Sequence, residues 1–205
     1  MAGLFITFEG IDGCGKSTQA KMLNDRLESS GKTIFLLREP GGTPISEQIR
    51  DVLLNPENDE ILSITEATLL AASRSQLTRE VILPELEKGH IIICDRYFDS
   101  SIAYQGYGRG LSIQWLTDLN SEATKGANPD VTIFVDIPIE VSRERIKSKS
   151  KDRMEKEGFE FLEKVRSGYL EIAGEKQDKF ITMDGTMTVE EIHSRIWDNI
   201  RKFIK

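Results

Sequence analysis

The chain has 205 residues, of which 39% are hydrophobic and 30% are charged, and its formal net charge is −7. This composition suits one globular domain over residues 1–205 and excludes a disordered chain. An acidic chain is a poor prior for nucleic-acid binding, so we expect no nucleic-acid partner.

The cysteines and the N-terminal segment indicate the cellular compartment in which the protein is expected to act. Cys14 and Cys94 stand in no CxxC pair and no zinc spacing. Their number allows one disulfide, but reduced thiols in a cytosolic protein are favoured. The N-terminus has no signal-peptide pattern, and no run approaches the ~20 apolar residues of a membrane helix. We therefore expect a cytoplasmic protein without a membrane partner.

Short apolar runs alternate with segments of helical spacing along the chain. The runs are continuous and rich in Ile, Val or Phe, which is typical of strands buried on both faces of a parallel sheet. They are Leu4–Phe8, Thr33–Leu37, His90–Cys94, Val131–Asp136 and Phe180–Met183. Between them, helical spacing connects Ala20 to Leu27, with Gly31 near the end, and then covers 67–81 and 113–119. Pro138 suits a first helical turn. The alternation predicts an α/β fold with a five-stranded parallel sheet flanked by helices, and ligands at the carboxyl ends of the strands.

The first run leads into a glycine-rich loop that matches G-x-x-x-x-G-K-[ST] at every fixed position. The glycines let several backbone N–H groups face one phosphate, and the next helix presents its positive N-terminal end to the same anion. The lysine places a cation on the outer phosphates, and the following serine hydroxyl can ligate Mg²⁺. The order of the glycines excludes a G-x-G-x-x-G dinucleotide site. The residues predicted to bind ATP are Gly10, Ile11, Asp12, Gly13, Cys14, Gly15, Lys16, Ser17 and Thr18.

Asp95 and Arg96 follow the third run directly. An acid at a strand end beside a P-loop can orient the water shell of Mg²⁺, and the arginine beside it can fork onto a phosphate. The alternative is a surface ion pair. With the P-loop in the same chain, we favour the functional interpretation.

A basic window follows the fourth run and carries a cation at every second position. Residues two apart do not share a helix face, so these charges surround a helix rather than form a stripe. One interpretation is a solvated helix surface. The other is a lid, about residues 143–157, that closes over the phosphates, supplies positive charge and excludes water. The cations are Arg143, Arg145, Lys147, Lys149, Lys151 and Arg153. A small chain with these features and no NKxD guanine motif indicates a P-loop kinase for a small molecule.

More specific motifs lie between these elements. They are Phe8-Glu9-Gly10-Ile11-Asp12-Gly13, Arg38-Glu39-Pro40-Gly41-Gly42-Thr43, Ala72-Ser73-Arg74, Asp95-Arg96-Tyr97, Ser100-Ser101-Ile102-Ala103-Tyr104-Gln105-Gly106, Pro129-Asp130 and Asp152-Arg153-Met154-Glu155. On these motifs the chain resembles the thymidylate kinase family in its bacterial form, over nearly its whole length. The resemblance implies transfer of phosphate from ATP to thymidine 5′-monophosphate, with Mg²⁺, in a three-layer P-loop NTPase fold with a basic lid. It also implies a homodimer.

The resemblance implies roles for individual residues. Asp12 would approach the sugar 3′-hydroxyl and the Mg²⁺ shell, and Arg96 would hold the acceptor phosphate with Arg38 near it. Arg74 would contact the thymine carbonyl. The base edge would meet Ser101 and Gln105, and Tyr104 would crowd the sugar 2′ position, which favours deoxyribose. The catalytic set implied is Lys16, Asp12, Arg96 and Arg153; the metal would meet Ser17 and, through water, Asp95.

Two departures from the family pattern matter. Gly13 stands where some members carry a P-loop arginine, so the missing cation is expected from the lid, with Arg153 as the first choice. Leu70 stands where many relatives stack an aromatic ring on thymine, so an aliphatic face, or Phe98, is expected to pack the base.

Several of these residues could instead have an ordinary structural role without contact to a ligand. Arg74 could be a helix-surface charge and Tyr104 ordinary core. For the glycines at 106, 108 and 110 we favour a flexible turn over a second phosphate loop. Asp184-Gly185 is a turn with a weak expected role near adenine. The rival functions are a kinase for another small nucleotide and a P-loop ATPase or switch without an acceptor.

Overall fold

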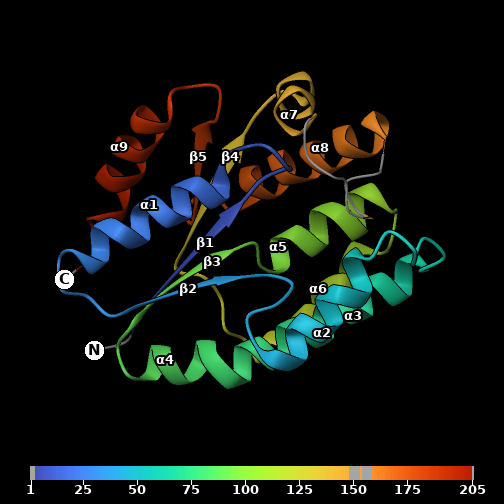
Figure 1. Cartoon of the computed structure of the whole chain (residues 1–205), viewed down its shortest axis with the longest axis horizontal. Coiled ribbons are helices and arrows are strands. Elements are labelled where there is room, and N and C mark those ends of the chain that lie inside the picture. Colours follow the sequence, from blue (N-terminus) through green and yellow to red (C-terminus); the bar gives the residue numbers. More distant parts are fainter. Residues whose placement is uncertain (1–2, 148–152, 154–157, 205) are drawn as a thin grey trace.

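The computed structural model describes residues 3–147, 153 and 158–204. An all-parallel sheet with strand order β2-β3-β1-β4-β5 runs through the molecule (Figure 1). The strands are β1 (Leu4–Glu9), β2 (Ile34–Arg38), β3 (Ile91–Asp95), β4 (Val131–Asp136) and β5 (Phe180–Asp184). Each boundary lies within one residue of the predicted one, so the five-stranded parallel sheet is confirmed.

Helices cover both faces of the sheet. Residues on β1 alternate between the two sides: Ile6 and Phe8 join a core cluster with Leu23 of α1, whereas Phe5 packs with Leu77 and Ile82. In Figure 1, α1 and α9 lie on one side of the strands and α4 lies on the other. The helices are α1 (Lys16–Glu28), α2 (Pro44–Leu54), α3 (Ser63–Leu77), η1 (Thr78–Ile82), α4 (Leu83–Glu87), α5 (Phe98–Ser101), η2 (Ile102–Gly108), α6 (Ile113–Thr124), α7 (Ile139–Ile146), α8 (Phe159–Glu175) and α9 (Val189–Ile200). The predicted three-layer α/β fold is confirmed.

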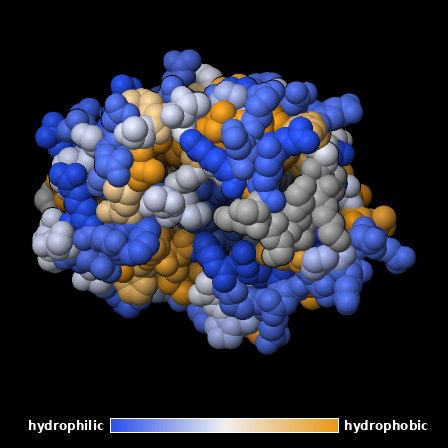
Figure 2. All heavy atoms as spheres, turned by 45° about the horizontal axis from the view of Figure 1, so that its top comes forward, coloured by the Kyte–Doolittle hydropathy of each residue, from blue (hydrophilic) through white to orange (hydrophobic). Residues whose placement is uncertain are grey.

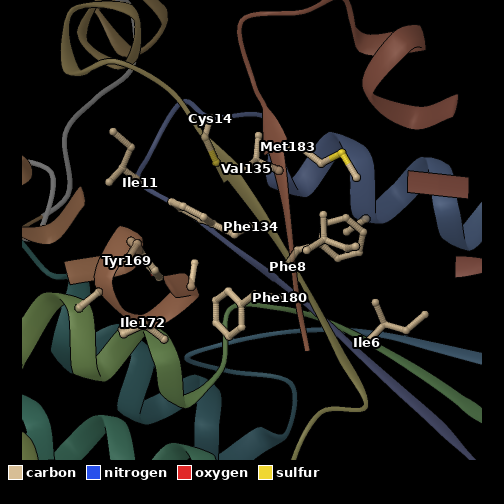
Figure 3. Packing of buried hydrophobic residues seen from close by; sticks show 14 of the residues in the cluster. Ile6, Phe8, Ile11, Cys14, Phe134, Val135, Tyr169, Ile172, Phe180 and Met183 are labelled. Carbon is tan, nitrogen blue, oxygen red and sulfur yellow. The ribbon is translucent and has the colours of Figure 1, made fainter. Parts of the chain in front are cut away.

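The main core fills the space around the central strands. Figure 3 shows buried side chains of this core on both sides of the strands: Phe8 of β1 and Met183 of β5 lie on one side, and Phe134 of β4 points to the other. Phe134 also stacks on Tyr169 of α8, with ring centroids 5.4 Å apart. Cys14 and Cys94 are buried free thiols, as expected. In the part of the chain that the structure describes, no helix combines the length and apolarity needed to cross a bilayer.

Local signals explain where several helices begin. Thr43 accepts a hydrogen bond from the Ser46 backbone N–H, and Pro44 occupies the first position of α2, where its missing N–H is harmless. Thr188 and Glu191 form a capping box at the start of α9. Pro138 caps α7. The helix predicted over 67–81 is longer than expected, because α3 continues through η1 into α4.

The glycines at 106 and 108 were predicted to form a flexible turn, and this prediction is wrong. Both lie in η2, a π-helical segment, and only Gly110 has a left-handed φ, of +78°. A Cβ on Gly106 would lie 2.4 Å from Ile113 Cδ1, and one on Gly108 would lie 2.6 Å from Phe161 Cε2. The requirement at these two positions is therefore close packing of η2 against α6 and α8.

Candidate active site

The P-loop joins β1 to α1 at the carboxyl end of the sheet. Gly10, Gly13 and Gly15 have φ of +141°, +78° and +96°, a region that favours glycine. A Cβ on Gly13 would lie 3.0 Å from the Ser142 carbonyl oxygen and 3.1 Å from Ile146 Cγ2. Gly13 is therefore also the residue on which α7 packs.

Helix α7 ties the P-loop to the loop after β5. Ser142 Oγ donates to the Asp12 carbonyl at 2.6 Å, and Arg145 donates to the carbonyls of Gly13, at 3.2 Å, and Gly185, at 3.0 Å. Arg145 is one of the predicted lid cations, and it here supports the backbone of the phosphate loop. The turn at Asp184-Gly185 consequently lies beside the P-loop.

Lys16, Ser17 and Asp95 meet where the first turn of α1 faces the end of β3. Lys16 is buried, with its Nζ 3.5 Å from Asp12 Oδ1. Ser17 Oγ donates a hydrogen bond to Asp95 Oδ2. Asp95 Oδ1 is buried and accepts no hydrogen bond from any described residue. A hydroxyl beside a carboxylate with one unused oxygen suits hydrated Mg²⁺, a hard cation that keeps several waters. The described residues contain no cluster of three or more His, Cys, Asp or Glu for a metal, so phosphates and water would complete its shell.

Arg96 anchors the other side of the P-loop. Its Nη2 donates to Asp12 Oδ1 at 2.6 Å and to Tyr104 Oη at 3.1 Å, and its Nη1 donates to the Gly10 carbonyl at 3.0 Å. Its φ of +71° is unfavourable for a non-glycine residue, and such strain persists only where surrounding contacts fix the backbone. Burial opposes ionisation of Asp12, but Arg96 and Lys16 outweigh it and hold the pKa of this carboxyl well below its usual range.

Glu9 fixes the turn that carries Arg96, and our sequence analysis assigned it no role. Glu9 Oε1 accepts the Tyr97 backbone N–H at 2.7 Å, and Oε2 accepts the hydroxyls of Ser100, at 2.6 Å, and Tyr169, at 2.9 Å. Burial, together with the charge of Asp99, raises the pKa of Glu9 to about 7 against the opposing effects of Ser100 and Arg96. The available signal was an acid at the end of an otherwise apolar strand, immediately before the P-loop glycine.

Arg74 is buried, 1% exposed, so the interpretation as a helix-surface charge is wrong. Its Nε donates to Glu39 Oε2 at 2.7 Å, and its Nη2 donates to the Tyr97 carbonyl at 3.2 Å and lies 2.6 Å from the same Glu39 oxygen. Its Nη1 donates to Ser101 Oγ at 3.1 Å and to Asn120 Oδ1. Each nitrogen of this guanidinium therefore donates to a protein acceptor. Burial raises the pKa of Glu39 to about 7 although Arg74 opposes the shift.

Lys16, Ser17, Asp95 and Arg96 line one cavity of about 370 Å³. All seven residues predicted to bind the acceptor line it, next to the P-loop and the end of β3: Arg38, Leu70, Arg74, Arg96, Ser101, Tyr104 and Gln105. Tyr104 is thus more than ordinary core, since its hydroxyl also bonds to Asp12 at 3.1 Å. Hydrophilic side chains border a central recess on the face that Figure 2 presents.

Helix α2 adds a wall that our sequence analysis missed. Arg50, Leu53 and Leu54 line the cavity from this helix, and Leu70 faces the same space. The cavity therefore has an aliphatic surface on this side. Phe98 is not among the lining residues; it packs beside Tyr97, with ring centroids 5.3 Å apart.

The predicted lid is described only in part. Lys149 and Lys151 lie outside the described residues. The guanidinium of Arg143 lies 4.3 Å from the centroid of the Phe159 ring. Arg153 is buried; its Nε donates to the Leu53 carbonyl at 2.8 Å, and its Nη2 donates to Glu66 Oε2 at 2.5 Å. It is not among the residues that line the cavity.

A P-loop at the central strand, a serine–aspartate pair beside it and an adjoining cavity with buried arginines define a P-loop protein with two neighbouring ligand sites. This is the architecture of a small-molecule phosphotransferase.

Comparisons with known proteins identify the family. The family model for thymidylate kinase matches residues 8–196. A thymidylate kinase of Caldanaerobacter subterraneus subsp. tengcongensis is 45% identical, over 100% of this chain and 98% of its own length. One of Fervidobacterium nodosum is 47% identical, over 94% and 96%. The crystal structure of thymidylate kinase from Ehrlichia chaffeensis superposes with a TM-score of 0.80 at 30% identity, over 98% of this chain and 99% of that one. The chain belongs to the thymidylate kinase family.

Proposed function

We propose that the protein transfers the γ-phosphoryl group of ATP to thymidine 5′-monophosphate, giving ADP and thymidine 5′-diphosphate. One observation carries this assignment: a single cavity connects Lys16 of the P-loop to Arg96 and to the residues expected to bind the base. A nucleotide switch without an acceptor has no use for this second set of side chains.

The proposed chemistry is positioning and charge neutralisation. Arg96, with Arg38 near it, holds the acceptor phosphate, and Lys16 contacts the outer phosphates of ATP. The attacking phosphate oxygen is already largely ionised at neutral pH, so no strong general base is needed. Mg²⁺ held by Ser17 and, through water, by Asp95 would neutralise charge on the ATP phosphates. Asp12 stays ionised beside Arg96 and orients its guanidinium.

ADP production with and without thymidine 5′-monophosphate tests the assignment. We expect acceptor-dependent ADP formation, and a lower rate with the other nucleoside monophosphates. Equal ADP formation without an acceptor would identify an ATPase, and a higher rate with another monophosphate would identify a different kinase.

Tyr104 is proposed to exclude the ribose 2′-hydroxyl. Its ring lies edge-on to Phe161 and Tyr169, with centroids 6.1 and 6.3 Å away, which fixes its plane. Tyr104→Ala should reduce the preference for deoxyribose over ribose by about tenfold in kcat/KM, since it removes the steric penalty. Tyr104→Phe keeps the ring and should keep the preference. An unchanged ratio in the alanine variant would discard the idea.

Arg153 is proposed to supply the lid cation that the P-loop lacks. Arg153→Ala should lower kcat by roughly ten- to a hundredfold and change the KM for thymidine monophosphate less, because transition-state charge is lost. The exposed Arg195→Ala on α9 is the control. If the KM rises and kcat stays constant, Arg153 binds substrate and does not stabilise the transition state.

The remaining proposals concern the extent of the domain, the cellular compartment and the oligomeric state. We propose one kinase domain over residues 1–205 that acts in the cytoplasm as a homodimer. Neighbouring helices α2, α3 and α6 expose apolar side chains, among them Val52, Ile64 and Trp115, which suit a self-association face. Light scattering that returned a monomer mass would contradict the dimer.

A further inference from the structure

Glu66, in the first turn of α3, is a buried carboxylate outside the groups discussed so far as substrate contacts. It is 1% exposed. Its Oε1 accepts the Gln105 Nε2 amide at 2.9 Å and Arg109 Nε at 3.3 Å. Its Oε2 accepts Arg109 Nη2 at 3.2 Å and Arg153 Nη2 at 2.5 Å. The carboxylate thus joins a cavity residue to two guanidinium groups.

The charge of Glu66 determines which end of the Gln105 side-chain amide, the NH₂ group or the oxygen, faces the carboxylate. Burial alone would raise the pKa of Glu66, but hydrogen bonds from Arg109, Gln105 and Arg153 and the charge of Arg109 outweigh it, so the pKa is lowered. An ionised carboxylate only accepts hydrogen bonds. Gln105 must therefore present its NH₂ group to Glu66, and its Oε1 lies on the other side of the amide.

The Gln105 oxygen is left for a ligand. Gln105 is 1% exposed and lines the cavity, and its Oε1 is buried without a hydrogen bond from any described residue. A buried amide oxygen without a donor is unfavourable, and a bound N–H group would remove this penalty. The cavity therefore offers a hydrogen-bond acceptor at this point.

Ser101 offers the complementary group. Its Oγ accepts a hydrogen bond from Arg74 Nη1 at 3.1 Å, which leaves its own O–H free to donate. Each nitrogen of Arg74 already donates to a protein acceptor, so in this arrangement the Ser101 hydroxyl is the donor that Arg74 orients. A hydroxyl donor and an amide acceptor match a base edge with a ring N–H beside a carbonyl, as in thymine or uracil. Cytosine presents the opposite pattern, a ring nitrogen acceptor beside an amino donor.

We propose that Glu66 is a positioning residue that holds the Gln105 amide with its oxygen toward the nucleobase, and so selects a pyrimidine with a ring N–H. This inference rests on the proposed function, because it assigns the base to the wall formed by Gln105 and Ser101.

The test compares two acceptors that differ only at this edge, thymidine 5′-monophosphate and 5-methyl-2′-deoxycytidine 5′-monophosphate. In Glu66→Gln the new amide can donate or accept a hydrogen bond, so the Gln105 amide can flip by 180°. We expect the ratio of the two kcat/KM values to fall by about tenfold, the effect of one hydrogen bond. Glu80→Gln is the matched control, since Glu80 also accepts a glutamine amide hydrogen bond, from Gln76 Nε2 at 2.7 Å, but at an exposed position. It should leave the ratio unchanged.

A second comparison separates positioning from a structural role. Gln105→Ala should lower the same ratio, and adding Glu66→Gln to it should lower the ratio no further, because Glu66 acts through the amide. A ratio unchanged in Glu66→Gln, or a further fall in the double variant, would overturn the proposal. If Glu66→Gln fails to fold, Glu66→Asp keeps the counter-charge for Arg109 and Arg153 while withdrawing from Gln105, and the same outcomes decide. Absent turnover of thymidine monophosphate by the wild type would instead refute the proposed function.

Discussion

Lys16→Ala is expected to lower kcat by a hundredfold or more, roughly the effect of removing one charge-stabilising donor from a phosphoryl-transfer site. Lys16 is buried in the P-loop with its Nζ 3.5 Å from Asp12 Oδ1, and its proposed role is to contact the outer phosphates of ATP. Steady-state ADP production with saturating thymidine monophosphate measures the loss.

The fold should survive this change. Without Lys16, Asp12 keeps its 2.6 Å contact with Arg96, so no unpaired carboxylate is left in the site. Lys21 on the same helix pairs with Asp25 at 2.8 Å and is exposed, which makes Lys21→Ala a control for the loss of a lysine from α1. A near-wild-type kcat for Lys16→Ala would contradict the assignment of the loop as the phosphate cradle.

Arg96→Lys is expected to reduce kcat/KM for thymidine monophosphate by roughly a hundred- to a thousandfold, because a lysine cannot reproduce a guanidinium fork. Arg96 reaches Asp12, Tyr104 and the Gly10 carbonyl at once. An ammonium group would hold one of these partners and would leave Asp12 or the acceptor phosphate poorly neutralised. The KM for ATP should change by less than the KM for the acceptor.

Arg166→Lys provides the matched control for Arg96. Arg166 forms a two-pronged pair with Asp136, at 2.7 and 2.9 Å, and does not line the cavity. Losing this fork should leave kcat/KM close to wild type. Equal losses in both variants would indicate a general effect of replacing paired arginines, and a normal acceptor KM in Arg96→Lys would remove Arg96 from the acceptor site.

Local signals made much of this molecule predictable. The strands were found within one residue because each is a continuous apolar run, and the P-loop because its fixed positions lie within one short segment. The residues expected to bind the acceptor were chosen from motifs, and the structure brings all seven to one cavity.

Features that depend on distant contacts were not predictable. Arg74 was left between a substrate contact and a surface charge, and its burial was not foreseen, since its partners Glu39, Tyr97 and Asn120 lie 35, 23 and 46 residues away. The glycines of η2 were misread because Ile113 and Phe161, which require them, lie in α6 and α8. The α2 wall was missed because Arg50, Leu53 and Leu54 belong to none of the motifs, and their sequence does not show that this helix folds over the cavity.

The π-helical geometry of η2 makes the length of this segment a determinant of the site. The Arg109 N–H bonds to the Tyr104 carbonyl five residues earlier, at 2.9 Å, so this turn contains one residue more than an α-helical turn. Tyr104 and Gln105 are adjacent in sequence, yet both face the cavity from it. Deleting one residue from Ile102–Gly108 would favour an α-helical turn, in which successive side chains lie about 100° apart, a larger angle than in the wider turn. Such a deletion would turn the side chains of Tyr104 and Gln105 away from each other even though both residues were retained.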